Sequence, residues 1–376
     1  MAHRTALVHD WLVTWGGAEQ VLAEMVDVLS PSALYCIVED LEPEHRGRFD
    51  GLELRTSFIQ RIPGSTSHFW HFAPLMPLAV EQFDLGRYDV VVSSSHAVAL
   101  GARTGPEQVH ISYVHSPMRF AWDLQGLYLD AFAYRRGPRS VAARLAFHYL
   151  RMWDRGAGTS VDDFVANSEF VAGRIRKIYG RPSTVIHPPV DVEHFTPGGS
   201  KGGYFLAGGR MNPFKRIDAI ASAFSTQLRD QRLVVIGDGP DLAKIEALAG
   251  PNVELVGRVS RDRLRDLLRG AEAFVHAATE DFGIAMAEAQ ACGTPVIAFG
   301  RGGAAEIVRT GEHEPAPTGE LFWQQNETGV VRGVRRFLAR RSRFEVDACR
   351  QNAERFGAER FRKELTGHVE QVLAAR

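Results

Sequence analysis

The feature that most constrains this sequence is a repeated alternation of short β-branched and apolar runs with longer amphipathic segments of helical period. This alternation is typical of β–α–β units and predicts parallel sheets covered by helices. It occurs twice along the chain, and a segment rich in proline and glycine at 187–203 separates the two series as a linker would. The sequence therefore predicts an α/β protein with two domains.

Each series begins with a strand, a turn containing two adjacent glycines and a helix. In the first series the strand is Thr5–His9 and the helix lies at about 18–29; in the second they lie at 204–207 and at about 216–228. Further strands are expected at 33–38, 89–93, 110–114, 163–166 and 184–187, and then at 232–236, 253–256, 273–276, 296–299 and 320–322. From about 329 to the end the pattern is helical.

These patterns predict two Rossmann-like domains that face a central cleft. We expect the first domain to comprise residues 1–199, completed by the last helix at about 358–376, and the second to comprise residues 200–357. Ligands of such sheets bind at the carboxyl ends of the strands. Motifs that directly follow a strand are therefore the first candidates for a site.

Composition excludes several classes of protein. The chain has 376 residues and a formal net charge of -1, so no global field attracts nucleic acid, and we expect no nucleic-acid partner. Cys36, Cys292 and Cys349 are far apart and lack C-x-x-C spacing, which argues against a disulfide framework and a zinc site. The N-terminal apolar stretch is interrupted by charged residues and does not resemble a signal peptide. We expect a cytoplasmic protein, with peripheral contact on the inner face of the plasma membrane left open.

The strongest candidate site is the segment from Glu280 to Glu288, which begins in the loop after the expected strand at 273–276. A helix is expected to start near Ile284, and the free amides and dipole at its N-terminus suit anionic phosphates. Glu280 before the helix and Glu288 within it can contact opposite ends of one ligand. The alternative is a capping acid followed by an exposed helical glutamate.

A second motif lies at the first strand–helix turn of the second domain, where Arg210 and Lys215 follow Gly208-Gly209. A departing nucleoside diphosphate gains negative charge in the transition state, and cations fixed beside it stabilise that charge. Arg210 can bind phosphate in a bidentate manner, whereas Lys215 supplies a point charge. The alternative is two solvated surface cations. Because no Asp-x-Asp motif ends a strand, we expect neither a metal ion nor a cofactor.

The segment Glu280-x7-Glu288, followed by Gly-x-Pro-Val, resembles the signature of the retaining family 4 glycosyltransferases, which have the GT-B fold. The resemblance covers nearly the whole chain and is most specific in the second domain. It implies that Glu280 faces the transferred sugar and its diphosphate, and that Glu288 accepts hydrogen bonds from the nucleotide ribose. It further implies that Arg210 and Lys215 bind the diphosphate. Backbone amides near Phe282, Gly283 and Ile284 would reach the sugar hydroxyls.

The resemblance also implies roles in the first domain. Gly16 and Gly17 open the first helix and correspond to a glycine pair close to the donor diphosphate and the acceptor. A lone glycine pair is more often only a tight turn. His115, in the run Tyr-Val-His-Ser-Pro after an expected strand, corresponds to a histidine beside the transferred sugar. Residues that could shape the acceptor pocket are Arg119, Trp122 and Asp123.

Two further segments concern the acceptor. The stretch 58–83 is rich in aromatic residues, and 135–155 combines arginines with aromatic residues in a helical pattern. A basic, aromatic helix can lie at an anionic membrane interface, and the alternative is an amphipathic helix packed on its own core.

Within the family, the first-domain motifs resemble GDP-mannose-dependent mannosyltransferases of bacterial O-antigen and exopolysaccharide assembly. The resemblance implies transfer of mannose from GDP-mannose, with retention, to a saccharide acceptor linked to polyprenyl diphosphate. A UDP-sugar donor is one alternative. Alternatives of another class are a non-hydrolysing nucleotide-sugar epimerase and a catalytically silent sugar-nucleotide binding protein.

Overall fold

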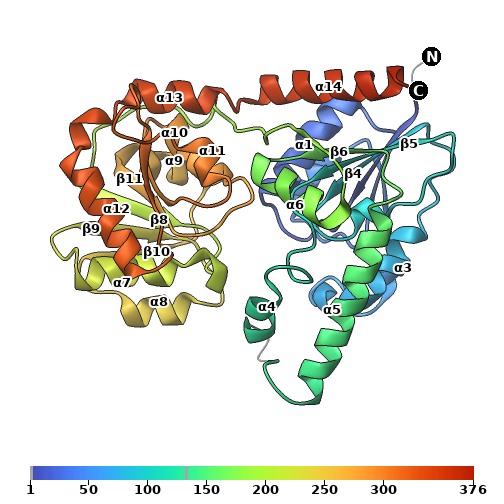
Figure 1. Ribbon diagram of the computed structural model, residues 1–376, viewed down its shortest axis with the longest axis horizontal. Coiled ribbons are helices and arrows are strands. Elements are labelled where there is room, and N and C mark those ends of the chain that lie inside the picture. The colour runs from blue at the N-terminus through green and yellow to red at the C-terminus, as the bar shows by residue number, and fades with distance from the viewer. Residues whose placement is uncertain (1–2, 132–133) are drawn as a thin grey trace. The chain divides into compact units, whose positions relative to one another are not determined.

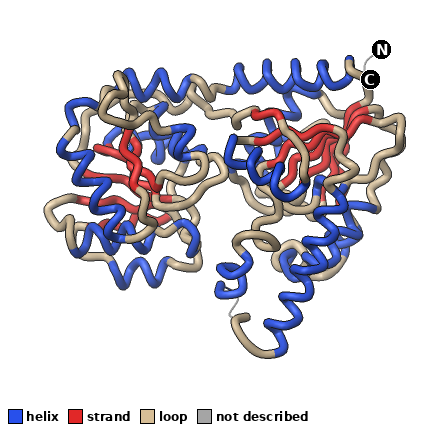
Figure 2. Tube along the Cα trace, in the orientation of Figure 1, coloured by secondary structure: helices blue, strands red, loops and turns tan. Residues whose placement is uncertain are grey.

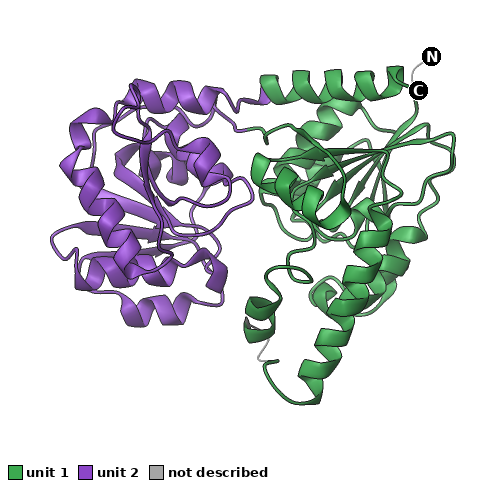
Figure 3. Ribbon diagram, in the orientation of Figure 1, with its two compact units in different colours: residues 1–189, 359–376 green, residues 190–358 purple. Residues whose placement is uncertain are grey.

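The computed structural model describes residues 3–131 and 134–376, and the chain divides into two compact units. The first unit comprises Met1–Pro189 with Glu359–Arg376, and the second comprises Val190–Ala358 (Figure 3). Each unit is built around one parallel sheet, with helices on both of its faces (Figures 1 and 2). The α/β class and the two-domain fold predicted from the sequence are confirmed.

The first unit contains a seven-stranded sheet in the order β3-β2-β1-β4-β5-β6-β7, and every adjacent pair is parallel. Its strands are β1 (Thr5–His9), β2 (Ala33–Cys36), β3 (Glu53–Thr56), β4 (Val90–Ser95), β5 (Val109–Val114), β6 (Asp163–Ala166) and β7 (Thr184–Val185). Its helices are α1 (Gly17–Leu29), α2 (Pro43–Arg46), α3 (Met76–Glu81), α4 (Gln125–Ala131), α5 (Pro138–Ala157), α6 (Glu169–Tyr179) and α14 (Ala358–Ala374). The central strands β4 and β5 are buried at every residue because both faces of the sheet are covered.

The last helix belongs to the first unit despite its position at the end of the chain. Phe361, Leu365 and Val369 recur at helical spacing on α14 and are buried among the apolar side chains of β1, β4 and β5. This spacing places them on one face of the helix. Helix α14 therefore completes the covering of one face of the sheet, beside α1 (Figure 1).

The second unit contains a six-stranded parallel sheet in the order β10-β9-β8-β11-β12-β13. Its strands are β8 (Tyr204–Gly208), β9 (Arg232–Ile236), β10 (Val253–Gly257), β11 (Ala271–His276), β12 (Val296–Phe299) and β13 (Gly319–Phe322). Its helices are α7 (Ile217–Thr226), α8 (Leu242–Leu248), α9 (Arg261–Gly270), α10 (Ile284–Ala291), α11 (Ala304–Ile307), α12 (Glu327–Ala339) and α13 (Val346–Glu354). One buried cluster lies on each face of this sheet.

The expected elements differ from the structure in two places. Strand β3 was not expected from the sequence. It lies at the edge of the sheet with all four side chains at least partly exposed, so Glu53–Thr56 mixes charged and apolar residues and lacks the apolar run of a buried strand. The division between the units falls between Pro189 and Val190 rather than between 199 and 200. Val190 N donates to Phe356 O at 2.8 Å, and Phe195 is fully buried in the core of the second unit. The end of the expected linker is therefore part of the second unit.

The strand orders locate one switch point in each sheet. Successive connections run in opposite directions from β1 and β4 in the first sheet, and from β8 and β11 in the second. Helices that leave two such neighbouring strands go to opposite faces, which opens a crevice at their carboxyl ends. The residues that follow β1, β4, β8 and β11 are therefore the ones that the fold places for ligand binding.

Candidate active site

In the second unit, the switch point brings together the two motifs singled out from the sequence. Lys215 lies in the turn after β8, and Glu280 lies in the loop after β11. Lys215 Nζ forms an ion pair and hydrogen bond with Glu280 Oε1. His276, the last residue of β11, has Nε2 at 3.0 Å from the same oxygen. An ionised carboxylate can only accept, so His276 Nε2 carries the proton of this hydrogen bond.

The electrostatics of this cluster keep Glu280 charged. Burial by itself raises the pKa of the Glu280 carboxyl, but the Lys215 ammonium and the His276 hydrogen bond outweigh burial. They hold this pKa well below its ordinary value. Glu280 is therefore a carboxylate at neutral pH, and it is an acceptor rather than a proton donor.

The loop that carries Glu280 is fixed by two glycines that follow β12. Gly303 N donates to Glu280 O at 2.9 Å, and Gly302 pairs with Glu280 as an isolated β-bridge. A Cβ at Gly302 would lie 2.1 Å from Glu280 O, and one at Gly303 would lie 2.0 Å from Phe282 O. Only glycine permits this approach of the two backbones, and the approach determines where the Glu280 loop lies.

Helix α10 begins directly after this loop, with Gly283 as its N-cap and Ile284 as its first residue. The first amides of a helix have no partner within it, so they point out from the N-terminus. Phe282 turns its ring into the core, where it packs edge-on against Phe356 with centroids 5.2 Å apart. Phe282 can therefore offer a ligand only its backbone, and the same holds for Gly283.

Glu288 lies in the second turn of α10 and is 8% exposed. Within the described residues its carboxyl group has no hydrogen-bond partner, and Arg261 and Asp191 are its charged neighbours. Burial raises the pKa of Glu288 to about 7, against a smaller opposing effect of Arg261. Its oxygens are not among the fully buried unpaired atoms, so they remain open to the hydroxyl groups of a ligand. The expected alternative, an exposed helical glutamate, is therefore wrong.

Arg210 lies in the same turn as Lys215, but its side chain is exposed. The backbone of this turn is ordered by Met211 N, which donates to Asp238 O at 2.8 Å. Arg210 therefore shares the turn with Lys215, but no contact among the described residues joins its side chain to the Lys215–Glu280 cluster.

In the first unit, Gly16 and Gly17 form the start of α1, close after β1. Gly16 N donates to Glu19 Oε2 at 2.9 Å, so the side chain of Glu19 closes the first turn of the helix. The other oxygen, Glu19 Oε1, lies 3.7 Å from His9 Nε2. The glycine turn is thereby linked to the end of β1.

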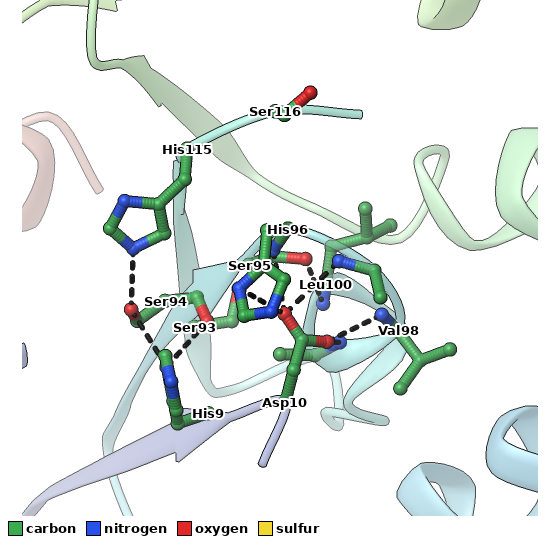
Figure 4. A network of polar contacts seen from close by, with 12 residues as sticks. His9, Asp10, Ser93, Ser94, Ser95, His96, Val98, Leu100, His115 and Ser116 are labelled. Carbon is green, nitrogen blue, oxygen red and sulfur yellow. Dashed lines mark hydrogen bonds and ion pairs between the residues drawn. The ribbon is translucent and has the colours of Figure 1, made fainter. Parts of the chain in front are cut away.

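His115 follows β5 at the same edge of the sheet and is 8% exposed. Its Nε2 lies 2.8 Å from Ser94 Oγ, and Asn167 Nδ2 donates to His115 O at 2.9 Å. Burial, followed by the neighbouring His96 and His9, holds the pKa of His115 well below its ordinary value. His115 is therefore a neutral imidazole at pH 7 (Figure 4).

Asp10 organises the loop between β4 and β5. Its fully buried carboxylate accepts four backbone hydrogen bonds, of 2.5 to 3.0 Å, from the amides of residues 96–99. His96 Nδ1 lies 3.1 Å from Asp10 Oδ2 (Figure 4). This anchoring holds His96 between His9 and His115, with ring centroids 5.6 and 6.2 Å away respectively.

The three residues expected around the acceptor have internal partners. Trp122 Nε1 donates to Asp154 Oδ2 at 2.7 Å, and Asp123 pairs with Arg174. Arg119 is partly buried and adds slightly to the lowering of the pKa of His96, which burial mainly causes. Trp122 and Asp123 therefore hold α5 and α6 in place, and Arg119 is the one of the three beside the histidines.

Sequence reasoning missed His276 in the second unit and His9, Asp10, Glu19, Ser94 and His96 in the first. A signal existed for His9, Asp10 and His276, because each stands at the end of an expected strand. The same signal existed for Ser94, which follows the expected strand at 89–93, but only the pairing of β1 with β4 brings it beside His9.

Two family models match the chain. The model for Glycosyltransferase Family 4 matches residues 15–194, and the model for Glycosyl transferases group 1 matches residues 194–356. The candidate residues of both units lie within these matches, except His9 and Asp10.

The chain is also similar to individual proteins. It is 31% identical over 186 residues to D-inositol 3-phosphate glycosyltransferase 2 of Catenulispora acidiphila. This match covers 40% of this chain and 43% of that protein. The chain thus spans less than half the length of this relative. It is 29% identical over 245 residues to the GDP-mannose-dependent alpha-mannosyltransferase of Mycolicibacterium smegmatis, covering 63% of each.

Among solved structures, Anabaena Alr3699/HepE in complex with UDP and glucose aligns with a TM-score of 0.67 at 16% identity. The alignment covers 98% of this chain and 100% of that one, which establishes a shared fold. Since the two family models together match residues 15–356, the chain belongs to the glycosyltransferases of the GT-B fold that combine a family 4 domain with a group 1 domain.

Proposed function

We propose that this protein transfers a hexosyl group from a nucleotide-sugar to a saccharide acceptor with retention of anomeric configuration. The observation that carries the proposal is the Lys215–Glu280–His276 cluster at the β8/β11 switch point, beside the N-terminus of α10. A cation, a fixed carboxylate and free helix amides stand together there. They match the three needs of a nucleotide-sugar: a charge for the diphosphate, an acceptor for sugar hydroxyls and donors for anionic oxygens.

The proposed roles follow from these groups. As the bond from the anomeric carbon to the diphosphate breaks, negative charge grows on the diphosphate, and Lys215 and Arg210 stabilise it. The acceptor oxygen forms its bond to the anomeric carbon on the same face, and its proton passes to the departing diphosphate oxygen. Glu280 stays ionised and positions the sugar, which agrees with its lowered pKa. Glu288 accepts hydrogen bonds from the ribose hydroxyls.

For the donor we propose GDP-mannose. The support is the resemblance of the first-domain motifs and the similarity to a relative named a GDP-mannose-dependent alpha-mannosyltransferase. A UDP-sugar is the competing donor, and it has support of its own in the solved complex with UDP and glucose. For the acceptor we propose a saccharide linked to polyprenyl diphosphate, in the synthesis of a cell-surface polysaccharide such as an O-antigen.

The test is incubation of the full-length protein with GDP-mannose or UDP-glucose, with and without a lipid-linked saccharide, followed by mass spectrometry and NMR of the products. We expect an α-linked mannosyl product and free GDP only when the acceptor is present. A β-linked product would contradict retention, and conversion of the donor sugar without acceptor would identify an epimerase. Nucleotide-sugar binding without either reaction would identify a silent binding protein.

We also propose that α5 places the protein at an anionic membrane, where such an acceptor is held. Its solvent-facing side carries Val141, Leu145, Tyr149 and Met152, which are 46–64% exposed and follow one another at helical spacing. Exposed arginines flank this apolar stripe, namely Arg139, Arg144 and Arg155. The only acidic residue of α5, Asp154, is fully buried. An exposed face that is both apolar and cationic suits an anionic lipid surface.

Helix α5 extends from the sheet of its own unit together with α4 (Figure 1). No helix within residues 3–131 and 134–376 is long and apolar enough to cross a bilayer.

Co-sedimentation with vesicles tests the membrane proposal. The wild type should bind vesicles containing phosphatidylglycerol, bind pure phosphatidylcholine weakly, and lose binding as salt rises. Leu145→Glu with Met152→Glu should abolish the binding, whereas Leu248→Glu, at an exposed position of α8 in the second unit, should not. Equal binding to the two kinds of vesicle, or unchanged binding of the double variant, would contradict the proposal.

A further inference from the structure

The ends of β1, β4 and β5 carry a buried series of polar contacts. Hydrogen bonds join His9, Ser94 and His115 (Figure 4), and Glu19 Oε1 lies 3.7 Å from His9 Nε2 without a hydrogen bond to it. His9 and Ser94 are fully buried, and His115 is nearly so. Neither His9 nor Ser94 has a place in the proposed function so far. The directions in which these hydrogen bonds are donated can be worked out from the partners.

His9 is the donor of the hydrogen bond that it shares with Ser94. Its Nδ1 lies 3.0 Å from the backbone oxygen of Ser94 and 3.0 Å from Ser94 Oγ. A carbonyl oxygen can only accept a hydrogen bond, so His9 Nδ1 must carry a proton. This N–H group is shared between the two oxygens of Ser94, and His9 Nε2 faces Glu19 Oε1 at 3.7 Å.

Ser94 is the donor of the hydrogen bond that it shares with His115. Within the described residues, its hydroxyl oxygen has two hydrogen-bonding neighbours, His9 and His115. Since His9 donates, the hydroxyl proton of Ser94 has one acceptor left, which is His115 Nε2 at 2.8 Å. A buried hydroxyl without an acceptor is costly, so this arrangement is the one that satisfies the Ser94 hydroxyl, whereas His9 Nε2 has no hydrogen-bond partner among the described residues.

The donor role of Ser94 determines which ring nitrogen of His115 carries the proton. A neutral imidazole has one donor and one acceptor nitrogen. Because Nε2 accepts from Ser94, the proton must lie on Nδ1. The described part of the chain offers Nδ1 no hydrogen-bond partner, and this atom is not among the buried unpaired ones. The Nδ1–H group is therefore free to donate to a ligand.

We propose that Ser94 and His9 are positioning residues that lock His115 as the Nδ1–H tautomer, so that His115 donates a hydrogen bond from Nδ1 to an oxygen of the transferred sugar. This inference rests on the proposed function for the identity of the ligand. The orientation of the ring and its tautomer are set by the protein alone. Glu19, whose Oε2 accepts from Gly16 N, has its Oε1 3.7 Å from His9 Nε2, so the glycine turn lies beside this network.

The sheet contains a matched control. Ser93 and His110 lie on the same two strands, are fully buried, and form the same kind of contact, with Ser93 Oγ 2.9 Å from His110 Nε2. His110 stands near the start of β5 rather than after its end, so this pair cannot reach a ligand at the carboxyl edge. Ser93→Ala removes a serine–histidine hydrogen bond of similar burial without touching His115.

Two measurements on the full-length protein test the inference. Long-range ¹H–¹⁵N correlation spectra report which ring nitrogen carries the proton, without any activity. Wild-type His115 should be protonated on Nδ1 at pH 7, and Ser94→Ala should redistribute the proton toward Nε2, whereas Ser93→Ala should leave His115 unchanged. An Nε2–H tautomer in the wild type, or identical His115 spectra in Ser94→Ala, would overturn the inference.

The second measurement compares two substitutions of His115 that place an amide at different ring positions. Asparagine places its NH₂ group near the position of Nδ1, and glutamine places it near Nε2. We expect His115→Asn to keep about tenfold more kcat/KM for the nucleotide-sugar than His115→Gln, and Ser94→Ala to lower it about tenfold. Ser93→Ala should lower the melting temperature but not kcat/KM. Equal loss in the two His115 variants would overturn the donor role.

The two proposals can fail separately. If no nucleotide-sugar is turned over while the spectra show the Nδ1–H form and its loss in Ser94→Ala, the proposed function fails and the locking of the tautomer stands. If transfer is observed but Ser94→Ala changes neither the spectra nor kcat/KM, the network is wrong and the proposed function stands.

Discussion

Lys215 and Glu280 are far apart in sequence but share one hydrogen bond, and each explains the state of the other. The ammonium keeps the Glu280 carboxyl ionised against the effect of burial, and His276 adds a second donor. In the proposed complex, Lys215 turns toward the diphosphate, and Glu280 retains His276 as a partner. The pair therefore keeps a cation at the β8/β11 switch point, and the ion pair satisfies both charges.

Lys215→Ala tests this role. Cations fixed beside the leaving group stabilise the transition state more than the bound donor, so we expect turnover to fall on the order of 100- to 1000-fold. Lys244→Ala, which removes an exposed ion pair to Asp218 of 2.7 Å in the same unit, is the control and should leave turnover unchanged. Near-normal turnover in Lys215→Ala would show that Lys215 has no part in the reaction.

Glu288→Gln should separate ligand binding from stability. The buried Glu288 has its pKa raised to about 7, so its charged form opposes folding. Stability due to the protonated carboxyl is complete below the unfolded pKa of 4.5 and is lost as the pH rises through about 7. The difference corresponds to about 3 kcal/mol above pH 8.

Thermal unfolding without ligand checks this expectation. Glu288→Gln should raise the melting temperature at pH 8 and change it little at pH 4.5. The same variant should weaken nucleoside diphosphate binding, because it loses charge-assisted hydrogen bonds to ribose of roughly 1.5–3 kcal/mol. A lower melting temperature at pH 8 would mean that a partner within the protein stabilises the charged carboxylate.

At the scale of elements, strands and connections are arranged so that two loops from one sheet edge support each other. The loop after β12 carries Gly302 and Gly303, and the loop after β11 carries Glu280 and leads into α10. Because β11 and β12 are paired in parallel, their carboxyl ends are neighbours. The backbone contact between the loops then determines the entry angle of α10 and the position of Glu280.

Gly303→Ala should therefore act on the site through the backbone. Its Cβ would meet Phe282 O at 2.0 Å, so the Glu280 loop must shift. We expect at least about a hundredfold loss of turnover, because small misplacement of positioned groups has effects of this size. Gly173→Ala in α6, where a Cβ meets nothing within 4 Å, should keep full turnover and gain slightly in stability. Unchanged turnover in Gly303→Ala, measured on protein with a native circular dichroism spectrum, would contradict this account.

At the scale of the whole molecule, two sheets of the same kind each present a switch point, but the chemistry of the two differs. The first has histidines and a buried aspartate, and the second has an ion pair and a helix N-terminus. Neutral donors in one domain suit sugar hydroxyls, and charged groups in the other suit a nucleoside diphosphate.

We expect the reaction of the complete protein to be independent of divalent cations. Lys215 supplies the charge that would otherwise have to come from a metal ion on the diphosphate. Full-length protein treated with EDTA and assayed with donor and acceptor should retain its wild-type rate. A rate that falls with EDTA and recovers on addition of magnesium or manganese would contradict this expectation.

The sequence by itself determined the two-domain α/β organisation, since hydrophobic period and glycine turns are local properties of neighbouring residues. It also determined that Lys215, Glu280 and His115 follow strands, because each motif is contiguous with the run that forms its strand. Only the tertiary structure decided which strand ends are neighbours. The order β3-β2-β1-β4-β5 brings His9, Ser94 and His115 to one edge, and β8 beside β11 joins Lys215 to Glu280.

The burial of Glu288 was likewise decided by packing over long distances in the sequence. The return of α14 to the first sheet confirms the expectation that the last helix completes the first domain. The periodicity of a helix shows which face is apolar, but it does not show which surface covers that face. Residue types and their spacing report local structure, whereas pKa shifts, tautomers and ion pairs depend on contacts between distant segments. For this protein the motifs could be found by reading along the chain, and their electrostatic states follow only from the arrangement of its strands.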